Sequence, residues 1–178
     1  MDDTFLVAKV VTQQDATAFG ELVRRHQSQI RNFLRKLTRD MDAADDLAQE
    51  TFLHAWDRMH TFVGHGTFIG WLLKVAYTTF LQAKRKSKRY EEILQQNATE
   101  SDGVQQVSES DEITDLDKFL AVLTAEERAV MMMSYACGMS HREIGDATDL
   151  PIGTVKSIIF RGKEKIRHGF GIEDHKYG

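Results

Sequence analysis

Apolar residues recur at spacings of three, four and seven along much of the chain, which is the pattern of amphipathic helices. The clearest stripe follows Asp15 and predicts a helix that ends near residues 38–40. Its inward positions are Phe19, Leu22, Val23, Ile30, Phe33, Leu34 and Leu37. His26 falls within this stripe, and we interpret it as a packing residue. Because the 178 residues include a single proline, long segments lack a helix breaker, and the sequence predicts an all-α fold.

A second helix is predicted to begin at Asp42, whose carboxylate can cap the first amide groups. Its inner face holds Leu47, Ala48, Thr51, Ala55, Trp56 and Met59. The opposite face is polar and acidic, with Asp45, Asp46, Gln49, Glu50, Leu53 and Asp57. Such a face is compatible with plain solvent exposure, with docking to another protein, or with acid–base or metal chemistry. No histidine or nucleophile is placed to complete a catalytic site here.

Residues 62–70 read FVGHGTFIG, and the three glycines predict a loop that presents the rings of Phe62 and Phe68. The helix that follows carries Trp71 and ends in five cations: Lys84, Arg85, Lys86, Lys88 and Arg89. Rings that stack on bases beside cations that neutralise phosphates are typical of surfaces for single-stranded nucleic acid. Cations at a helix C-terminus also stabilise the helix dipole without any ligand, so both interpretations stay open.

Net charge is −4, and the acidity is concentrated in residues 91–117, which hold nine acids and no base. This stretch has few apolar residues, and they show no sustained periodicity, so it cannot bury enough surface to offset the entropy of ordering it. We expect residues 91–112 to be a flexible linker. It would separate two helical domains, residues 1–90 and 113–178, each folded around its own core.

Two capping boxes fix helix starts in the second domain. Thr124 and Glu127 form one and Ser140 and Glu143 the other, which predicts helices beginning near 125 and 141. The first of these helices is predicted to end at Gly138. Pro151 suits the first turn of a third helix. A helix, a short turn and a second helix in this order predict a helix-turn-helix, whose second helix enters the major groove of DNA.

The last helix separates into two faces. Ile152, Val155, Ile159 and Ile166 are expected to pack inward. The outward positions are Lys156, Ser157, Phe160, Arg161, Lys163 and Lys165. Glu164 is the only acid between residues 150 and 172, whereas a purely solvated helix is expected to carry mixed charge. The pattern favours a helix that contacts DNA.

Composition excludes several other classes of protein. A lone cysteine, Cys137, rules out an internal disulfide and fits a reducing compartment. The pairs His60/His65 and Cys137/His141 lack further ligands at a usable spacing, so we expect neither a metal nor a cofactor. The N-terminus is acidic, and its apolar stretch is too short for a signal peptide. No stretch of the sequence approaches the roughly 20 apolar residues of a membrane span. We expect a cytoplasmic protein without membrane insertion.

The chain resembles an extracytoplasmic-function sigma factor, the minimal branch of the sigma-70 superfamily. Three segments carry the resemblance: DAADDLAQETFLHAWDRM to the polymerase-binding helix of region two, FVGHGTFIGWLLKVAYTTFLQAKRKSKR to the minus-ten and melting segment, and LTAEERAVMMMSYACGMSHREIGDATDLPIGTVKSIIFRGKEKIR to region four. Ala76-Tyr77-Thr78 stands where the family commonly has Ala-Arg-Asn, Gly162 where alanine is usual, and Ile158 where a basic or polar residue is frequent.

The resemblance implies a non-enzymatic transcription initiation factor that binds core RNA polymerase, through its β′ and β subunits, and promoter DNA, and that is controlled by an anti-sigma factor. It assigns Asp46, Gln49, Glu50 and Leu53 to polymerase binding. It assigns recognition and melting of the minus-ten promoter element to Phe62, His65, Phe68, Trp71, Lys74, Lys84 and Arg85. It assigns the minus-thirty-five element to Thr154, Lys156, Ser157, Phe160, Arg161 and Lys165.

Two other functions are compatible with parts of the sequence. A DNA-binding regulator could use only the C-terminal helix-turn-helix, with the N-terminal helices as a sensor or dimerisation module. It would bind duplex DNA without polymerase. A metal-dependent hydrolase built on Asp45, Asp46 and Glu50 would show activity with divalent cations and no DNA.

Overall fold

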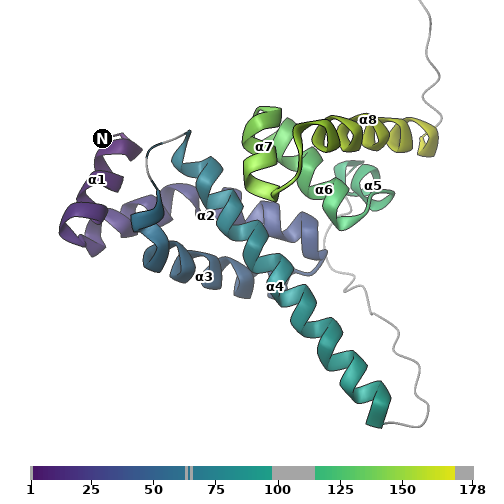
Figure 1. The fold of residues 1–178 in the computed structure, drawn as a ribbon, viewed down its shortest axis with the longest axis horizontal. Helices are drawn as coiled ribbons and strands as arrows, with labels where there is room; N and C mark the ends of the chain where they lie inside the picture. Colours follow the sequence, from purple (N-terminus) through teal and green to yellow (C-terminus); the bar gives the residue numbers. More distant parts are fainter. Residues whose placement is uncertain (1, 63, 65, 98–114, 171–178) are drawn as a thin grey trace, which may run out of the picture.

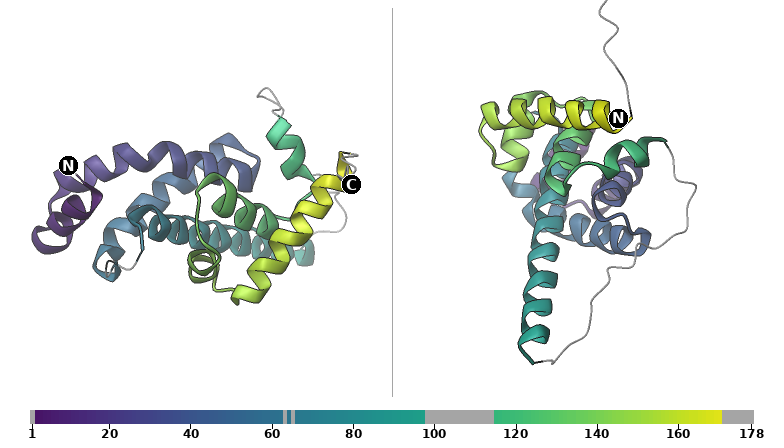
Figure 2. Two further views of the ribbon diagram at one scale, coloured as in Figure 1. Left: turned by 90° about the horizontal axis from the view of Figure 1, so that it is seen from above. Right: turned by 90° about the vertical axis from the view of Figure 1, so that its right-hand side faces the viewer.

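The computed structural model describes residues 2–62, 64, 66–97 and 115–170, and within these residues the chain is helical, without a β-strand (Figure 1). The first four helices form one group and the last four a second group beside it (Figures 1 and 2). The all-α class is confirmed. In chain order the helices are α1 (Asp3–Gln13), α2 (Ala16–Thr38), α3 (Met41–Arg58), the 3₁₀ turn η1 (Met59–Thr61), α4 (Phe68–Asn97), α5 (Asp115–Ala121), α6 (Ala125–Met131), the π-helical turn η2 (Met132–Ala136), α7 (His141–Thr148) and α8 (Ile152–Gly169).

Aspartate caps determine where α2 and α3 begin. Asp15 Oδ1 accepts hydrogen bonds from the amides of Thr17 and Ala18, at 2.9 and 3.0 Å, and α2 runs to Thr38 as predicted. The cap of α3 is Asp40, which accepts from the Ala43 amide at 2.9 Å, so the prediction of Asp42 was wrong. Arg39 already ends α2 in a left-handed conformation, with φ 59°, and this leaves the extended Asp40 as the residue free to cap.

The N-terminal helix α1 was not predicted from the sequence. Its apolar residues Leu6, Val7 and Val10 are buried, and the helix packs on α2, η1 and α4. Asp3 forms an ion pair with Arg25 of α2, with 3.0 Å between Oδ1 and the guanidinium nitrogen. Eleven residues make too short a helix to be stable alone, so these contacts with the other helices must hold it in place.

Helix α4 is longer at both ends than the sequence analysis expected. It begins at Phe68, so the loop predicted over 62–70 is shorter, and it continues to Asn97. Residues 91–97, expected to belong to the linker, are therefore helical. Ser87 Oγ donates to Glu91 Oε1 one turn later, at 3.3 Å, and no proline or glycine lies between Trp71 and Asn97. The rest of the predicted linker, 98–112, lies outside the described residues. The C-terminal end of α4 projects from the body (Figures 1 and 2).

Both predicted capping boxes are present in the second group. Thr124 caps the Glu127 amide while the Glu127 carboxylate accepts from the Thr124 amide, and Ser140 and Glu143 repeat the arrangement. Helices α6 and α7 begin at the predicted residues. After α6 the chain widens into the π-helical turn η2 and reaches Gly138, whose φ of 65° is left-handed. Helix α5, the first helix of the second group, was not predicted.

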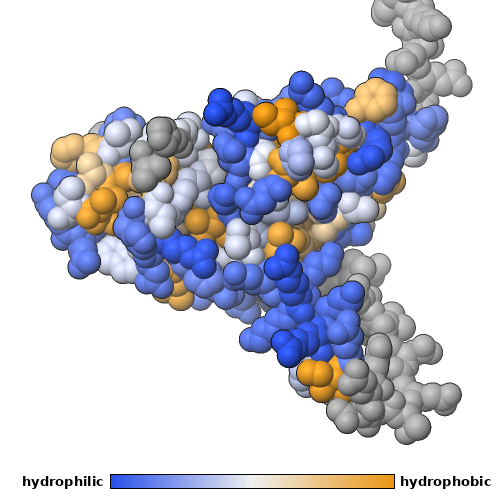
Figure 3. Space-filling model, in the orientation of Figure 1, coloured by the Kyte–Doolittle hydropathy of each residue, from blue (hydrophilic) through white to orange (hydrophobic). Residues whose placement is uncertain are grey.

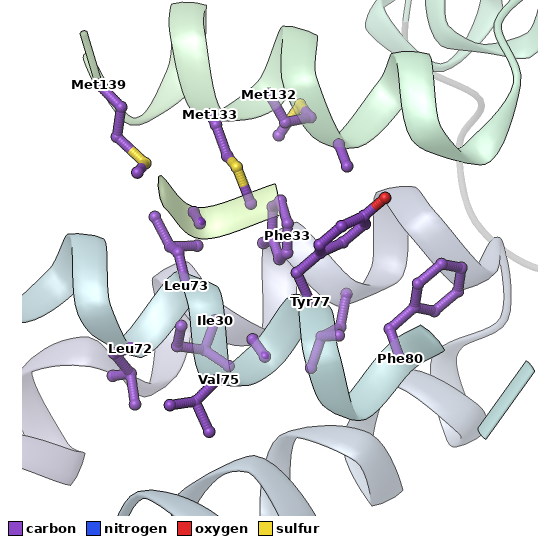
Figure 4. Packing of buried hydrophobic residues seen from close by; sticks show 14 of the residues in the cluster. Ile30, Phe33, Leu72, Leu73, Val75, Tyr77, Phe80, Met132, Met133 and Met139 are labelled. Atoms are coloured by element: carbon purple, nitrogen blue, oxygen red, sulfur yellow. The ribbon is translucent and has the colours of Figure 1, made fainter. Parts of the chain in front are cut away.

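The two groups of helices pack against each other and share one cluster of buried residues. Figure 4 shows Met132, Met133 and Met139 pointing from η2 and its neighbourhood toward the side of α2 and α4 that carries Phe33, Leu73 and Tyr77. Polar contacts add to this packing: Lys36 Nζ lies 2.6 Å from Asp117 Oδ1, and the Arg128 guanidinium donates to the Leu37 carbonyl at 3.3 Å. Two separate cores were predicted from the sequence, whereas the buried residues that the structure describes form one continuous cluster.

Candidate protein and nucleic-acid interfaces

The polar face of α3 is open to solvent. Asp46, Gln49, Glu50 and Leu53 are exposed, and Leu53 has 68% of its surface accessible. Leu47, Ala48, Thr51, Ala55 and Met59 lie on the buried side, as predicted. Trp56 was expected there too, but it is 36% exposed and sits edge-on against Phe19 of α2, with ring centroids 5.0 Å apart. The resulting surface combines carboxylates with two accessible apolar side chains, a composition suited to contact with another protein.

Three aromatic rings meet where α4 begins. Phe62, Phe68 and Trp71 contact one another, with centroid separations of 5.7 to 5.9 Å. Phe68 was expected to present its ring to solvent, but it is only 5% exposed because the other two rings and His26 pack around it. Phe62 and Trp71 are partly exposed and form the outer side of the cluster. His65 lies outside the described residues.

Lys74, on the next turn of α4, is bound by the second group of helices. Its ammonium donates to the Asp146 carbonyl at 2.5 Å and lies 3.4 Å from the Asp149 carboxylate. Both acceptors stand at the C-terminus of α7, where the helix dipole favours a cation. Lys74 was predicted to contact DNA, and these acceptors were not predicted, because no local signal links residues more than 70 positions apart.

The projecting end of α4 carries an exposed group of cations. Lys84, Arg85, Lys86, Lys88 and Arg89 are all exposed, and the hydrophilic colour covers this part of the helix in Figure 3. Tyr77, which stands where the family commonly has arginine, is instead buried beneath the second group. Burial, with a contribution from Glu126, raises the pKa of Tyr77 to about 12. The basic end can meet phosphates, whereas Tyr77 serves packing.

Helix α8 presents a polar and basic outer face. Lys156, Ser157, Phe160 and Arg161 are exposed, with Phe160 at 66%, and Thr154 is partly buried. Ile152 was expected to pack inward but is 46% exposed. Ile158, which was not among the predicted inward residues, is buried, with 2% of its surface exposed. Ile158 therefore cannot read DNA. Gly162 is buried against Met131: a Cβ at this position would lie 3.1 Å from the Met131 sulfur, so α8 approaches the C-terminal end of α6 closely here.

Lys165 is held within its own domain. Its ammonium donates to both oxygens of Glu127, at 2.7 and 2.8 Å, although the sequence analysis assigned it to DNA. Burial alone would raise the pKa of Glu127, but the hydrogen bonds from Lys165 and from the Thr124 amide outweigh it and hold the pKa below its ordinary value. One carboxylate thus completes a capping box and ties α8 to α6.

The described residues contain no group of three or more histidine, cysteine or acidic side chains that could hold a metal ion. Asp45, one of the acids considered for such a site, lies 3.4 Å from Arg31. In the part of the chain that the structure describes, no helix has the length and apolar content needed to cross a membrane.

Comparison with known proteins gives two family matches in sequence order. The model of sigma-70 region 2 matches residues 22–90, and that of sigma-70 region 4 matches residues 113–166. Together they cover most of the chain. Helix α1 lies before the first match.

Individual relatives agree with these matches, although the chain spans only about 60% of the first of them. The ECF RNA polymerase sigma factor SigE of Mycolicibacterium smegmatis is 30% identical over 84% of this chain and 60% of that protein. The factor SigW of Bacillus subtilis is 26% identical, with 89% and 92% covered. The sigma-E factor of Haemophilus influenzae is 28% identical, with 94% and 95% covered.

Two solved structures share the fold. The sigma factor RpoE in complex with the anti-sigma factor NepR, from Bartonella quintana, has a TM-score of 0.70 and 23% identity, covering 87% of this chain and 98% of that one. CnrH in complex with the cytosolic domain of CnrY has a TM-score of 0.68 and 22% identity, covering 97% and 99%. The two regions in their expected order, the relatives and the shared fold show that the chain belongs to the extracytoplasmic-function branch of the sigma-70 family, the transcription initiation factors that direct RNA polymerase to promoters.

Proposed function

We propose that the chain binds core RNA polymerase through the exposed face of α3, reads promoter DNA with α4 and α8, and assists strand opening at the start of α4. The β′ and β subunits of polymerase are the expected contacts. The chain itself performs no catalysis, because bond formation belongs to the polymerase, and it acts in the cytoplasm. The observation that carries the proposal is the outer face of α8: Lys156, Ser157, Phe160 and Arg161 point away from a helix-turn-helix core whose inner residues are buried.

Polymerase binding is assigned to Asp46, Gln49, Glu50 and Leu53. These side chains are exposed together on one face of α3, while the apolar face opposite is buried in the fold. A mixture of carboxylates and an accessible leucine suits a partner with basic and apolar groups. The face requires no rearrangement of α2 or α4 to become available.

Strand opening is assigned to the aromatic cluster and the basic end of α4. Capturing a base that has left the duplex costs about a few kcal/mol of unstacking, which ring contacts and phosphate contacts must offset. Phe62 and Trp71 offer partly exposed rings, with Phe68 as the buried ring behind them. Lys84 and Arg85 offer exposed cations further along the same helix.

An anti-sigma factor is the expected regulatory partner. The solved relatives RpoE and CnrH are described as complexes with NepR and with the cytosolic domain of CnrY, and the first of these partners is named an anti-sigma factor. By analogy, we expect this chain to be inhibited by a protein that covers its polymerase-binding or DNA-binding faces.

Co-elution with core polymerase, followed by gel-shift analysis on promoter fragments, tests the proposal. We expect the chain to bind polymerase without DNA, and to bind promoter duplex specifically only as part of that complex. Specific duplex binding by the chain alone, with no association with polymerase, would favour the stand-alone helix-turn-helix regulator. Hydrolysis that depends on a divalent cation would favour an enzyme instead.

A further inference from the structure

The aromatic cluster at the start of α4 has a buried support that comes from α2. The ring of His26 lies against Phe68, with centroids 5.4 Å apart, and Phe68 is the inner ring on which Phe62 and Trp71 rest. His26 retains only 13% of its side-chain exposure. A shift of the His26 ring would therefore change the surface that holds Phe68 in place.

The orientation of His26 is fixed from α1. His26 Nε2 lies 2.8 Å from Asp3 Oδ2, and since an ionised carboxylate only accepts, Nε2 donates. The other oxygen of Asp3 lies 3.0 Å from Arg25, which also binds Glu21 at 2.8 Å. Asp3 is thus held in place by an arginine while it orients a histidine. This contact links an N-terminal helix outside the matched sigma-70 region to the cluster beneath the α3–α4 loop.

We propose that Asp3 and His26 are positioning residues for strand opening: Asp3 fixes the His26 ring, and that ring sets the place of Phe68 and, through it, of Phe62 and Trp71. This inference rests on the proposed function of the aromatic cluster. Neither residue has to touch DNA. A surface that captures a base must be held to within a fraction of an ångström, and side chains behind it supply that constraint.

The test uses holoenzyme on two templates that share one promoter sequence. One template is fully paired, and in the other the minus-ten segment is already unpaired by mismatches. Opening of the paired template is followed by the fluorescence of 2-aminopurine placed in that segment, and transcript formation is measured on both. Asp3→Ala and His26→Phe should each slow opening of the paired template about tenfold, the effect of losing one hydrogen bond to a charged group. Transcription from the unpaired template should stay within about twofold of the parent protein.

Three variants beyond these two separate positioning from general stability: the double variant, Glu21→Gln and Asp3→Glu. His26→Phe keeps an aromatic ring beside Phe68 and leaves the Asp3–Arg25 pair intact, so α1 stays attached. The double variant Asp3→Ala with His26→Phe should be no slower than Asp3→Ala alone, because both changes remove the hydrogen bond between Asp3 and His26. Glu21→Gln is the matched control: it weakens the Arg25 end of the network without contacting His26 or Phe68, and should open the paired template normally. Asp3→Glu retains a carboxylate and should recover part of the rate.

Several results would overturn the inference while leaving the proposed function in place. These are normal opening of the paired template by Asp3→Ala and His26→Phe, equal losses on the paired and unpaired templates, or additive losses in the double variant. Failure of the parent holoenzyme to open the paired template at all would instead remove the proposed function, and this inference with it.

Discussion

Arg161 lies on the outer face of α8 and is exposed, five residues after Lys156 on the same helix. If it forms a bidentate contact with a base, Arg161→Ala should cost about 1–3 kcal/mol on the preferred upstream element and little on a scrambled one. Binding of holoenzyme to both sequences across a salt series measures this difference. Lys163→Ala, a loss of charge two residues away, should weaken both sequences alike and lower the salt slope by about one unit. Unchanged selectivity in Arg161→Ala would show that α8 does not read bases there.

Glu127 illustrates how a residue that looks like a helix cap can also be a tertiary contact. Glu127→Gln retains an oxygen for the capping box but loses the charge that binds Lys165, so it should lower the free energy of unfolding by about 1 kcal/mol at pH 7. The folded-state pKa of Glu127 lies below its ordinary value, so the stabilisation is present above that ordinary value and is lost as pH falls through the folded pKa. Denaturant unfolding at pH 7 and at pH 3 should show the difference shrinking in acid.

Lys165→Ala should reproduce the loss of stability at pH 7, because it removes the other half of the same pair. Glu126→Gln, an exposed neighbour in the same helical turn, should change the unfolding free energy by less than about 0.5 kcal/mol. Equal stability of Glu127→Gln and the parent protein at pH 7 would contradict the structural role given to this pair.

At the scale of the element, the exposed face of α3 can be altered without disturbing its buried side. Gln49→Ala combined with Glu50→Arg should weaken binding to core polymerase at least about tenfold, or ~1.4 kcal/mol, because it removes a polar contact and reverses a charge. Titration calorimetry or competition with the parent protein measures the affinity. Glu126→Arg makes the same change of charge on α6 and should bind normally. Parent-like affinity of the double variant, with an unchanged circular dichroism spectrum, would remove α3 as the docking element.

Helices with their own start signals could be predicted from the sequence, and helices held by other helices could not. Asp15, Thr124 and Ser140 each cap an amide three residues on, which is a local interaction, and α2, α6 and α7 begin where expected. Helix α1 is short and depends on α2 for its burial. The candidate site divides in the same way: exposure of Gln49, Glu50 and Arg161 follows from helical periodicity, but the pairing of Lys74 and Lys165 depends on residues 72 and 38 positions away.

At the scale of the whole molecule, the two groups of helices must separate when both promoter elements are bound. Promoter elements centred at positions minus ten and minus thirty-five are about 25 base pairs apart, which is roughly 85 Å of duplex. Helix α7 contacts α4, and α8 packs on α7, so the two helices that we propose bind DNA lie within a few helix diameters of about 10 Å each. We therefore expect the packed arrangement in the free chain and a separated one in the promoter complex.

A charge placed in the contact between the two groups should open the free chain. Met139 is 8% exposed, and a Cβ atom added to Gly70 of α4 would lie 3.8 Å from its terminal methyl carbon. Met139→Glu should therefore enlarge the radius of gyration in small-angle X-ray scattering, because an unpaired carboxylate is costly to bury. Tyr135→Glu, at a position 58% exposed, is the matched control and should leave the radius unchanged. The same radius for Met139→Glu, with full helical content, would contradict a packed free state.

The most direct measurement of the central claim is transcription by core polymerase from a library of randomised promoters, with and without the chain, and with transcript starts mapped by sequencing. The family assignment and the positions of α3, α4 and α8 predict a set of starts that appears only when the chain is present and that shares two upstream sequence elements. Arg161→Ala should relax the upstream element of that set, and the Gln49→Ala, Glu50→Arg variant should reduce transcription from the whole set. An identical pattern of starts with and without the chain would contradict its role as a promoter-directing initiation factor.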